Sequence, residues 1–178
     1  MGWERKRGKL HEFNGLLRDV KTTSYSVCIG DLSRLPAVRY VITLDADSEL
    51  PLHGAWRLVG TLNHPLNQAS FDPRTGTLRG GYSIIQPRTE IKPVSANHSR
   101  FSQIYAGDTG LDLYTHAVSD VYQDLFGAGI YVGKGIYDVD AFERSLSDRV
   151  PENSLLSHDL FEGIQARVGL ATDIVVYE

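Results

Sequence analysis

Two aspartates, Asp45 and Asp47, stand one residue apart where an apolar stretch of the chain ends. That stretch, residues 38–44, is rich in β-branched and aromatic residues and predicts a buried strand. Ligands of open α/β sheets collect at the carboxyl ends of strands, and two carboxylates there suit Mg²⁺ or Mn²⁺, which bridge carboxylates to nucleotide phosphates. An isolated Asp-x-Asp also occurs in solvated turns and helix caps, and a second one is present at Asp138 and Asp140. The strand placement favours Asp45 and Asp47 as the metal site.

A run of basic residues at positions 5–9 is the second candidate. It opens a helix that the recurrence of Leu10, Phe13 and Leu17 at three- and four-residue steps predicts. Backbone N–H groups and cationic side chains at a helix start can together hold a diphosphate. A solvated face or an interaction tail is the alternative that the run alone leaves open.

Ser157, His158 and Asp159 form a third candidate, directly before the apolar helix pattern of residues 160–168. The helix dipole stabilises a carboxylate in the first helical turn, which keeps it ionised and able to accept a proton. Capping by Ser157, with Asp159 as a dipole partner, explains the same residues equally well. A hydrolytic triad is excluded, because adjacent residues at a helix start point in different directions.

Two further polar candidates are Gln86 with Arg88, at the end of a predicted strand, and Gln123, inside a predicted helix. Planar, bidentate hydrogen bonds would let these side chains face a sugar or a nucleotide. They would also serve to satisfy buried backbone groups. The residues alone leave both roles open.

Residues 129–135 (GIYVGKG) resemble a phosphate-binding P-loop, but two positions exclude that motif. Ala128 stands where the first glycine is needed, and Gly135 replaces the Ser or Thr that holds magnesium. Nucleotide binding through a Walker motif is therefore excluded.

The composition is that of one ordinary globular domain. The chain has 178 residues, of which 42% are apolar and 22% are charged. Eighteen Lys and Arg against 22 Asp and Glu give a net charge of -4, so a general affinity for nucleic acid is not expected. The single cysteine, Cys28, points to a reducing compartment. Apolar runs fall far short of the roughly 20 residues that span a bilayer.

Strands separated by helices indicate an α/β layered domain that must position these candidates. The predicted helices are 10–17, 56–62, 99–126, 141–146 and 159–168, and the predicted strands are 38–44, 82–86, 130–132 and 174–177. Residues 63–81 are predicted to be a loop, with a turn at 72–76.

The order of these pieces resembles that of one enzyme group. A basic start, a strand ending in Asp-Ala-Asp, a Gly-rich segment and an Asp just before a helix are similar to inverting, processive GT-A-fold glycosyltransferases, which include cellulose and hyaluronan synthases. More specifically, several long stretches resemble the glycosyltransferase region of cyclic β-1,2-glucan synthases. They are residues 3–10 (WERKRGKL), 40–47 (YVITLDAD), 64–67 (HPLN), 119–126 (SDVYQDLF), 133–139 (GKGIYDV), 151–153 (PEN) and 156–160 (LSHDL).

This resemblance implies an α/β fold with a GT-A-like, Rossmann-related mixed sheet flanked by helices. It implies metal-dependent transfer of glucose from UDP-glucose to a growing β-1,2-glucan with inversion, and Mg²⁺ or Mn²⁺ as the cofactor. A nucleotide sugar and a glucan acceptor are the expected partners. The parent protein is expected to be embedded in the inner membrane with this part on the cytoplasmic side, while the chain itself is expected to be soluble.

The resemblance also implies roles for the donor-binding residues. Asp45 and Asp47 match the metal-binding Asp-x-Asp that positions UDP-glucose. Arg7 and Lys9 match the basic segment near the donor diphosphate. Together they define the expected donor side of the site.

On the acceptor side, Asp159 matches the general base that deprotonates the acceptor hydroxyl. His158 stands where the wider group has Glu in its Thr-Glu-Asp motif. Lys134 lies in a segment that corresponds to the region flanking the acceptor.

The chain departs from the family pattern at both ends. The family has the first β-α units of the nucleotide-binding half upstream of Trp3, and a Gln-x-x-Arg-Trp motif followed by membrane helices downstream of Glu178. We therefore expect residues 1–178 to be a partial GT-A-type domain, incomplete at both ends. Two alternatives stay open: a non-catalytic nucleotide- or sugar-binding remnant, and a glycoside hydrolase or phosphorylase that uses two carboxylates such as Asp45 and Asp159.

Overall fold

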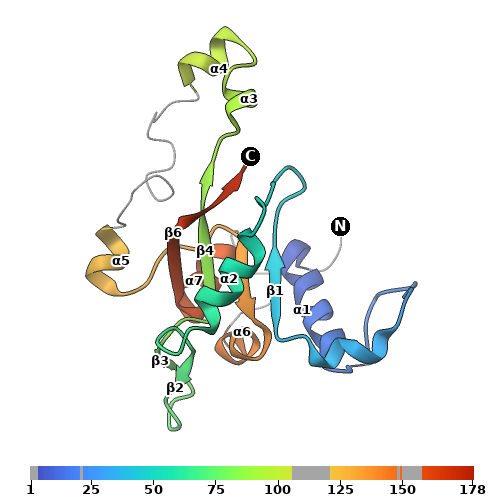
Figure 1. Cartoon of the computed structure of the whole chain (residues 1–178). Helices are drawn as coiled ribbons and strands as arrows, with labels where there is room; N and C mark the ends of the chain where they lie inside the picture. Colours follow the sequence, from blue (N-terminus) through green and yellow to red (C-terminus); the bar gives the residue numbers. More distant parts are fainter. Residues whose placement is uncertain (1–3, 21, 106–120, 148, 150–157) are drawn as a thin grey trace.

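The computed structural model describes residues 4–20, 22–105, 121–147, 149 and 158–178 (Figure 1). The helices are α1 (Arg5–Leu17), the 3₁₀ helix η1 (Leu32–Ala37), α2 (Gly54–Asn63), α3 (Pro93–Ala96), α4 (Arg100–Tyr105), α5 (Val121–Phe126), α6 (Val139–Leu146) and α7 (His158–Ala166). The strands are β1 (Tyr40–Thr43), β2 (Ser70–Phe71), β3 (Leu78–Gly80), β4 (Ile84–Glu90), β5 (Gly135–Asp138) and β6 (Val168–Tyr177).

A mixed sheet in the order β1-β5-β4-β6 forms the centre of the described part of the chain (Figure 1). β4 and β6 are parallel, whereas β5 runs antiparallel to both of its neighbours, β1 and β4. β1, β4 and β6 therefore share one direction, and the start of β5 lies beside the carboxyl end of β1. This arrangement confirms the prediction of a mixed α/β sheet flanked by helices.

The core lies on both faces of the sheet, because successive strand residues point to opposite sides. Ile84 and Tyr137 belong to the apolar cluster on the face that α6 and α7 cover. Their strand neighbours Ile85 and Ile136 pack with Leu58 of α2 on the other face. Burying each of these side chains contributes roughly 1.5–3 kcal/mol, so the two faces hold the strand ends in place.

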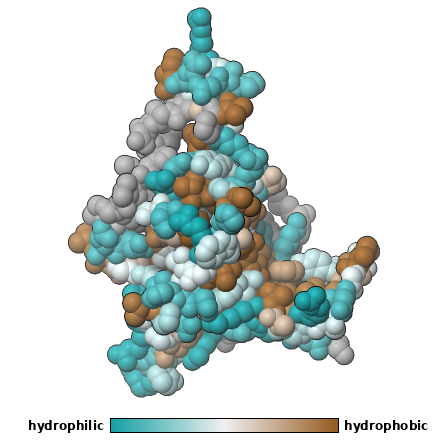
Figure 2. Space-filling view, viewed as in Figure 1, coloured by the Kyte–Doolittle hydropathy of each residue, from teal (hydrophilic) through white to brown (hydrophobic). Residues whose placement is uncertain are grey.

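An arm formed by α3 and α4 extends beyond the end of β4 (Figure 1). Its apolar side chains are exposed, with Val94, Phe101 and Ile104 at 80%, 70% and 69% of full exposure (Figure 2). Across the ranges that the structure describes, no helix is long and apolar enough to cross a membrane.

Most predicted elements are confirmed with shifted boundaries. The helix begun by the basic run is α1, the strand before Asp45 is β1, and the helix that carries Asp159 is α7. The carboxyl-terminal strand is longer than predicted, because β6 begins at Val168. α4 and α5 lie at the two ends of the helix predicted over 99–126, and residues 106–120 lie outside the described part of the chain.

Two local predictions were wrong. Residues 130–132 are not a strand: the backbone N–H of Val132 donates to the side chain of Gln86 at 2.7 Å, and the strand β5 starts only at Gly135. The predicted loop 63–81 contains the hairpin β2–β3. The turn predicted inside it is confirmed, since the side chain of Asp72 accepts hydrogen bonds from the backbone N–H groups of Arg74 and Thr75.

Replacing Gly135 by alanine is expected to destabilise the fold by about 2–4 kcal/mol. Gly135 has a φ of +142°, and a Cβ there would collide with the carbonyl oxygen of Ile85 on the neighbouring strand. Gly60→Ala is the matched control, because a Cβ on this α2 residue meets no atom within 4 Å, and it should stabilise by about 0.5–1 kcal/mol. Urea unfolding of the two variants measures both values. Equal stability of the two variants would contradict the close approach of β5 to β4.

Candidate functional site

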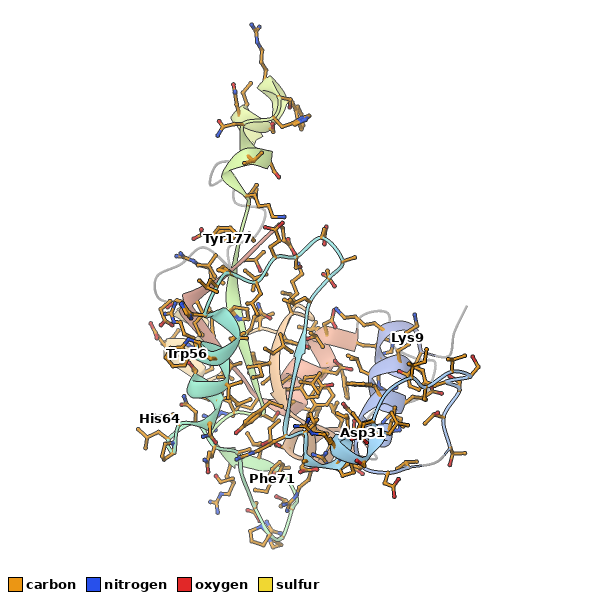
Figure 3. The ribbon with its side chains drawn as sticks, turned by 45° about the vertical axis from the view of Figure 1, so that its right-hand side comes forward. Lys9, Asp31, Trp56, His64, Phe71 and Tyr177 are labelled. Atoms are coloured by element: carbon orange, nitrogen blue, oxygen red, sulfur yellow. The ribbon has the colours of Figure 1, made fainter. Side chains whose placement is uncertain are left out.

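The turn after β1 carries Asp45 to the edge of the sheet where β5 begins. Thr43, the last residue of β1, pairs with Gly135, the first residue of β5. The backbone N–H of Ser48 donates to the carbonyl of Asp45 at 3.1 Å, which closes the turn. Glu49 then exchanges two backbone hydrogen bonds with Tyr177 at the end of β6, at 2.8 and 2.9 Å. The Asp45 turn is thus fixed at both ends, and Figure 3 marks Tyr177 at this edge.

Two lysines converge on the Asp45 carboxylate. Lys6 of α1 donates to one oxygen at 2.9 Å, and Lys134 lies 3.4 Å from the other. The hydrogen bond from Lys6 is the main cause that lowers the pKa of Asp45, and the charge of Lys134 adds to it. The side chain is 43% exposed, so this ionised carboxylate still faces solvent.

Each lysine also contacts a second group. Lys6 donates to the carbonyl of Gly133 at 2.9 Å, and Lys134 makes a close ion pair with Glu178. α1, the loop before β5 and the last residue of the chain are therefore joined through Asp45 and its two lysines.

Asp159 in the first turn of α7 contacts the same loop. A Cβ at Gly133 would lie 3.0 Å from both carboxylate oxygens of Asp159, so a glycine lets the loop pass this close. Burial raises the pKa of Asp159, and the charge of Asp45 raises it further, while Lys6 and His158 oppose the rise. The structure therefore brings Asp45, Lys134 and Asp159 together, and the arrangement offers an ionised carboxylate beside a more basic one.

Asp47 is exposed in the same turn. Mg²⁺ is commonly held by one or two carboxylates, with phosphate oxygens and water as its remaining ligands. Asp45 and Asp47 are carboxylates of the type that such a cation takes as ligands, and in this structure the Asp45 carboxylate is paired with Lys6 and Lys134. A site made by protein groups alone does not fit, because no cluster of three or more His, Cys, Asp or Glu suited to a metal exists among the described residues.

The second Asp-x-Asp has a structural role instead. Asp138 caps α6, accepting a hydrogen bond from the backbone N–H of Ala141 at 3.1 Å. Asp140 pairs at 2.7 Å with Arg18, which directly follows α1.

The basic run divides into residues that face different ways. Arg7 turns toward Glu4, with a nitrogen–oxygen distance of 3.4 Å, and its side chain is mostly buried. Lys9 is exposed on α1 (Figure 3). Lys6, which sequence reasoning did not single out, makes the contact to Asp45. Arg7 lies three residues before Leu10, on the same helix face as the apolar stripe, and this spacing would have predicted that its side chain turns inward.

His158 lies at the start of α7 and points to the start of α1. Its Nε2 is 3.2 Å from a carboxylate oxygen of Glu4. Its predicted helix cap, Ser157, lies outside the described residues.

Glu162, one turn beyond Asp159 on α7, is a buried carboxylate that the sequence reasoning missed. It is 3% exposed, and burial followed by the charge of Asp159 raises its pKa to about 7. The sequence pattern pointed to the other face of α7: Leu160 and Ile164 of the predicted apolar stripe are 52% and 69% exposed, whereas the buried face carries Glu162, Gly163 and Ala166.

The two glutamines left open by sequence reasoning satisfy backbone groups. Gln86 is 1% exposed and accepts the Val132 N–H bond, which anchors the loop that leads to Lys134. Gln123 bonds to both the N–H and the carbonyl of Leu170 on β6. Gln86 therefore supports the site without facing it.

Comparison with known proteins supports the family resemblance drawn from the motifs. No protein-family model matches the chain. The whole chain is similar to part of the cyclic beta-(1,2)-glucan synthase NdvB of Rhizobium meliloti (strain 1021), with 48% identity over 180 residues. The chain spans about 6% of the length of that protein.

The buried Glu162 is expected to make stability fall as the pH rises. Its pKa is about 7 in the folded chain against a reference value of 4.5, so the folded state binds more protons between these values and the ionised form opposes folding above them. The difference corresponds to at most roughly 3 kcal/mol. We expect Glu162→Gln to gain about 1–3 kcal/mol over wild type near pH 8 and much less near pH 5, by urea unfolding. The exposed Glu49→Gln is the control, and an equal pH response of the two variants would contradict the prediction.

Proposed function

We propose that this chain is part of a metal-dependent glucosyltransferase that moves glucose from UDP-glucose to a growing β-1,2-glucan with inversion. The observation that carries the proposal is the meeting of Asp45 and Asp159, which lie far apart in the sequence, around one loop with Lys6 and Lys134. The similarity to a cyclic beta-(1,2)-glucan synthase supports the same reaction class. We further propose that the parent protein is membrane-embedded and binds its nucleotide sugar on the cytoplasmic side of the inner membrane, as the resemblance implies.

In the proposed reaction, the donor diphosphate lies beside Asp45 and Asp47. Lys6 and Lys134 provide positive charge for it and orient the turn that carries Asp45. Arg7 and Lys9 remain proposed contributors to this basic side. Mg²⁺ or Mn²⁺ held by Asp45 and Asp47 would offset the charge of the departing UDP.

Asp159 is the proposed general base. It takes the proton of the acceptor hydroxyl while the acceptor oxygen bonds to the anomeric carbon and the bond from that carbon to UDP breaks. A raised pKa suits this role, because a carboxylate that is harder to ionise binds a proton more strongly once it is ionised. Attack opposite to the leaving group inverts the α-linked donor to a β-linked product. Lys134 and His158 flank this side of the site.

Removing the metal ligand is expected to weaken nucleotide binding. Calorimetry should show UDP binding that requires Mn²⁺, and Asp47→Ala should raise the UDP Kd by about tenfold or more in the presence of Mn²⁺. Asp173→Ala is the matched control, because this aspartate is 73% exposed and pairs with Arg57 of α2. UDP binding that is independent of metal and unchanged in Asp47→Ala would contradict the metal role.

Removing the base is expected to stop transfer while donor binding persists. Asp159→Asn in the full-length gene product should lower kcat for glucose transfer by about 100-fold or more, and the UDP Kd should stay within about threefold. Asp173→Asn is the control for a lost carboxylate. UDP binding without any transfer by the wild type would instead support the binding remnant.

Glycoside hydrolysis is a second candidate, because Asp45 and Asp159 have pKa values shifted in opposite directions. Paired carboxylates of that kind can divide acid and base roles. Cleavage of a β-glucan in the absence of any nucleotide sugar, lost in Asp159→Asn, would favour this candidate over the transferase.

A further inference from the structure

The Glu4 carboxylate and the His158 imidazole form a buried contact between the starts of α1 and α7. A carboxylate oxygen of Glu4 lies 3.2 Å from Nε2 of His158, and the two side chains are only 1% and 14% exposed. Arg7 approaches the same carboxylate oxygen at 3.4 Å. A histidine of one helix and an arginine of the other therefore both contact the Glu4 carboxylate.

The local stability of α1 does not explain this arrangement. Glu4 occupies the N-cap position with φ at +51°, in the left-handed region that non-glycine residues rarely adopt, and its side chain makes no capping hydrogen bond to α1. Burying a carboxylate is unfavourable unless it is paired. Strained backbone with a buried charge persists where surrounding contacts hold it, often at functional sites.

The pair joins the two helix starts that carry the proposed site. Lys6, two residues after Glu4, donates to Asp45 and to the carbonyl of Gly133. Asp159 directly follows His158, and the loop at Gly133 lies against its carboxylate. A shift of one helix start relative to the other would therefore move Asp159 relative to Lys6 and Asp45.

We infer that the Glu4–His158 pair is a positioning device that fixes Asp159 against Lys6 and Asp45. This inference rests on the proposed transferase function, in which Asp159 must contact the acceptor while Asp45 and Lys6 hold the donor. Glu4 reaches the His158 imidazole from the start of α1, and His158 directly precedes Asp159. Both are positioning residues, because they act through the first turn of α7.

The activity test uses the full-length gene product with Glu4→Gln, His158→Gln and the double variant. Each single variant should lower kcat about 10- to 100-fold, while KM for UDP-glucose stays within about threefold, because a small misplacement of the base slows the chemical step. The double variant should be no slower than the slower single variant. Exchanging the two residues, Glu4→His with His158→Glu, rebuilds the pair in the opposite order and should recover most of the lost kcat.

A second measurement does not depend on activity. Amide hydrogen exchange over residues 162–166, whose N–H groups bond within α7, should quicken about tenfold in Glu4→Gln and return toward wild type in the exchanged variant. Arg57→Gln is the matched control, since it breaks the exposed Arg57–Asp173 pair on α2 and should change neither readout.

The outcomes separate this inference from the proposed function. If the wild type transfers glucose and both single variants keep kcat within about twofold, the positioning role is overturned. If the wild type transfers no glucose, the proposed function fails. The amide hydrogen exchange of α7 then decides alone whether the Glu4–His158 pair holds that helix. Unchanged exchange in Glu4→Gln overturns the inference in either case.

Discussion

The ion pairs around Asp45 are the interaction on which the geometry of this edge of the protein depends. Lys6 reaches Asp45 from α1, and Lys134 reaches it from the loop before β5 while also pairing with Glu178. Partly exposed ion pairs of this kind stabilise a fold by little, about 0–1 kcal/mol each. Their effect is geometric: segments from the start, the middle and the end of the chain meet at one carboxylate. The glycine at 133 permits this, because a side chain there would crowd Asp159.

The mixed direction of the sheet explains why such distant segments can meet. Asp45 follows the carboxyl end of β1, whereas Lys134 precedes the amino end of β5. In an all-parallel sheet, a residue before one strand and a residue after its neighbour would lie at opposite edges. Because β5 is antiparallel to β1, its start lies beside the end of β1, where Gly135 pairs with Thr43. The antiparallel strand is therefore what delivers Lys134 and Gly133 to the turn that carries Asp45.

Local sequence patterns predicted the helices and strands better than they predicted the contacts between side chains. An apolar stripe and a β-branched run located α1 and β1, because burial of one face leaves a period in the sequence. The stripe that located α7 is not the buried face of that helix, since Leu160 and Ile164 are exposed. The strand predicted at 130–132 failed because the backbone N–H of Val132 donates to the side chain of Gln86, and no local pattern encodes such a partner. Which basic residue of α1 contacts Asp45, Lys6 rather than Arg7 or Lys9, depends on how α1 is rotated about its axis. That rotation is set by packing of distant residues, as is the burial of Glu162.

The balance of charge at this edge gives a physical reason to expect a divalent cation with the nucleotide. Three carboxylates lie around two lysines there and a fourth is exposed in the same turn, so the two lysines do not by themselves offset both the protein carboxylates and an added diphosphate. The groups are Asp45, Asp47, Asp159, Glu178, Lys6 and Lys134. The hydrogen bond from Lys6 keeps Asp45 ionised, while burial raises the pKa of Asp159. A cation beside Asp45 and Asp47 would leave the lysines free to contact phosphate oxygens, and burial would remain the main cause of the raised pKa of Asp159.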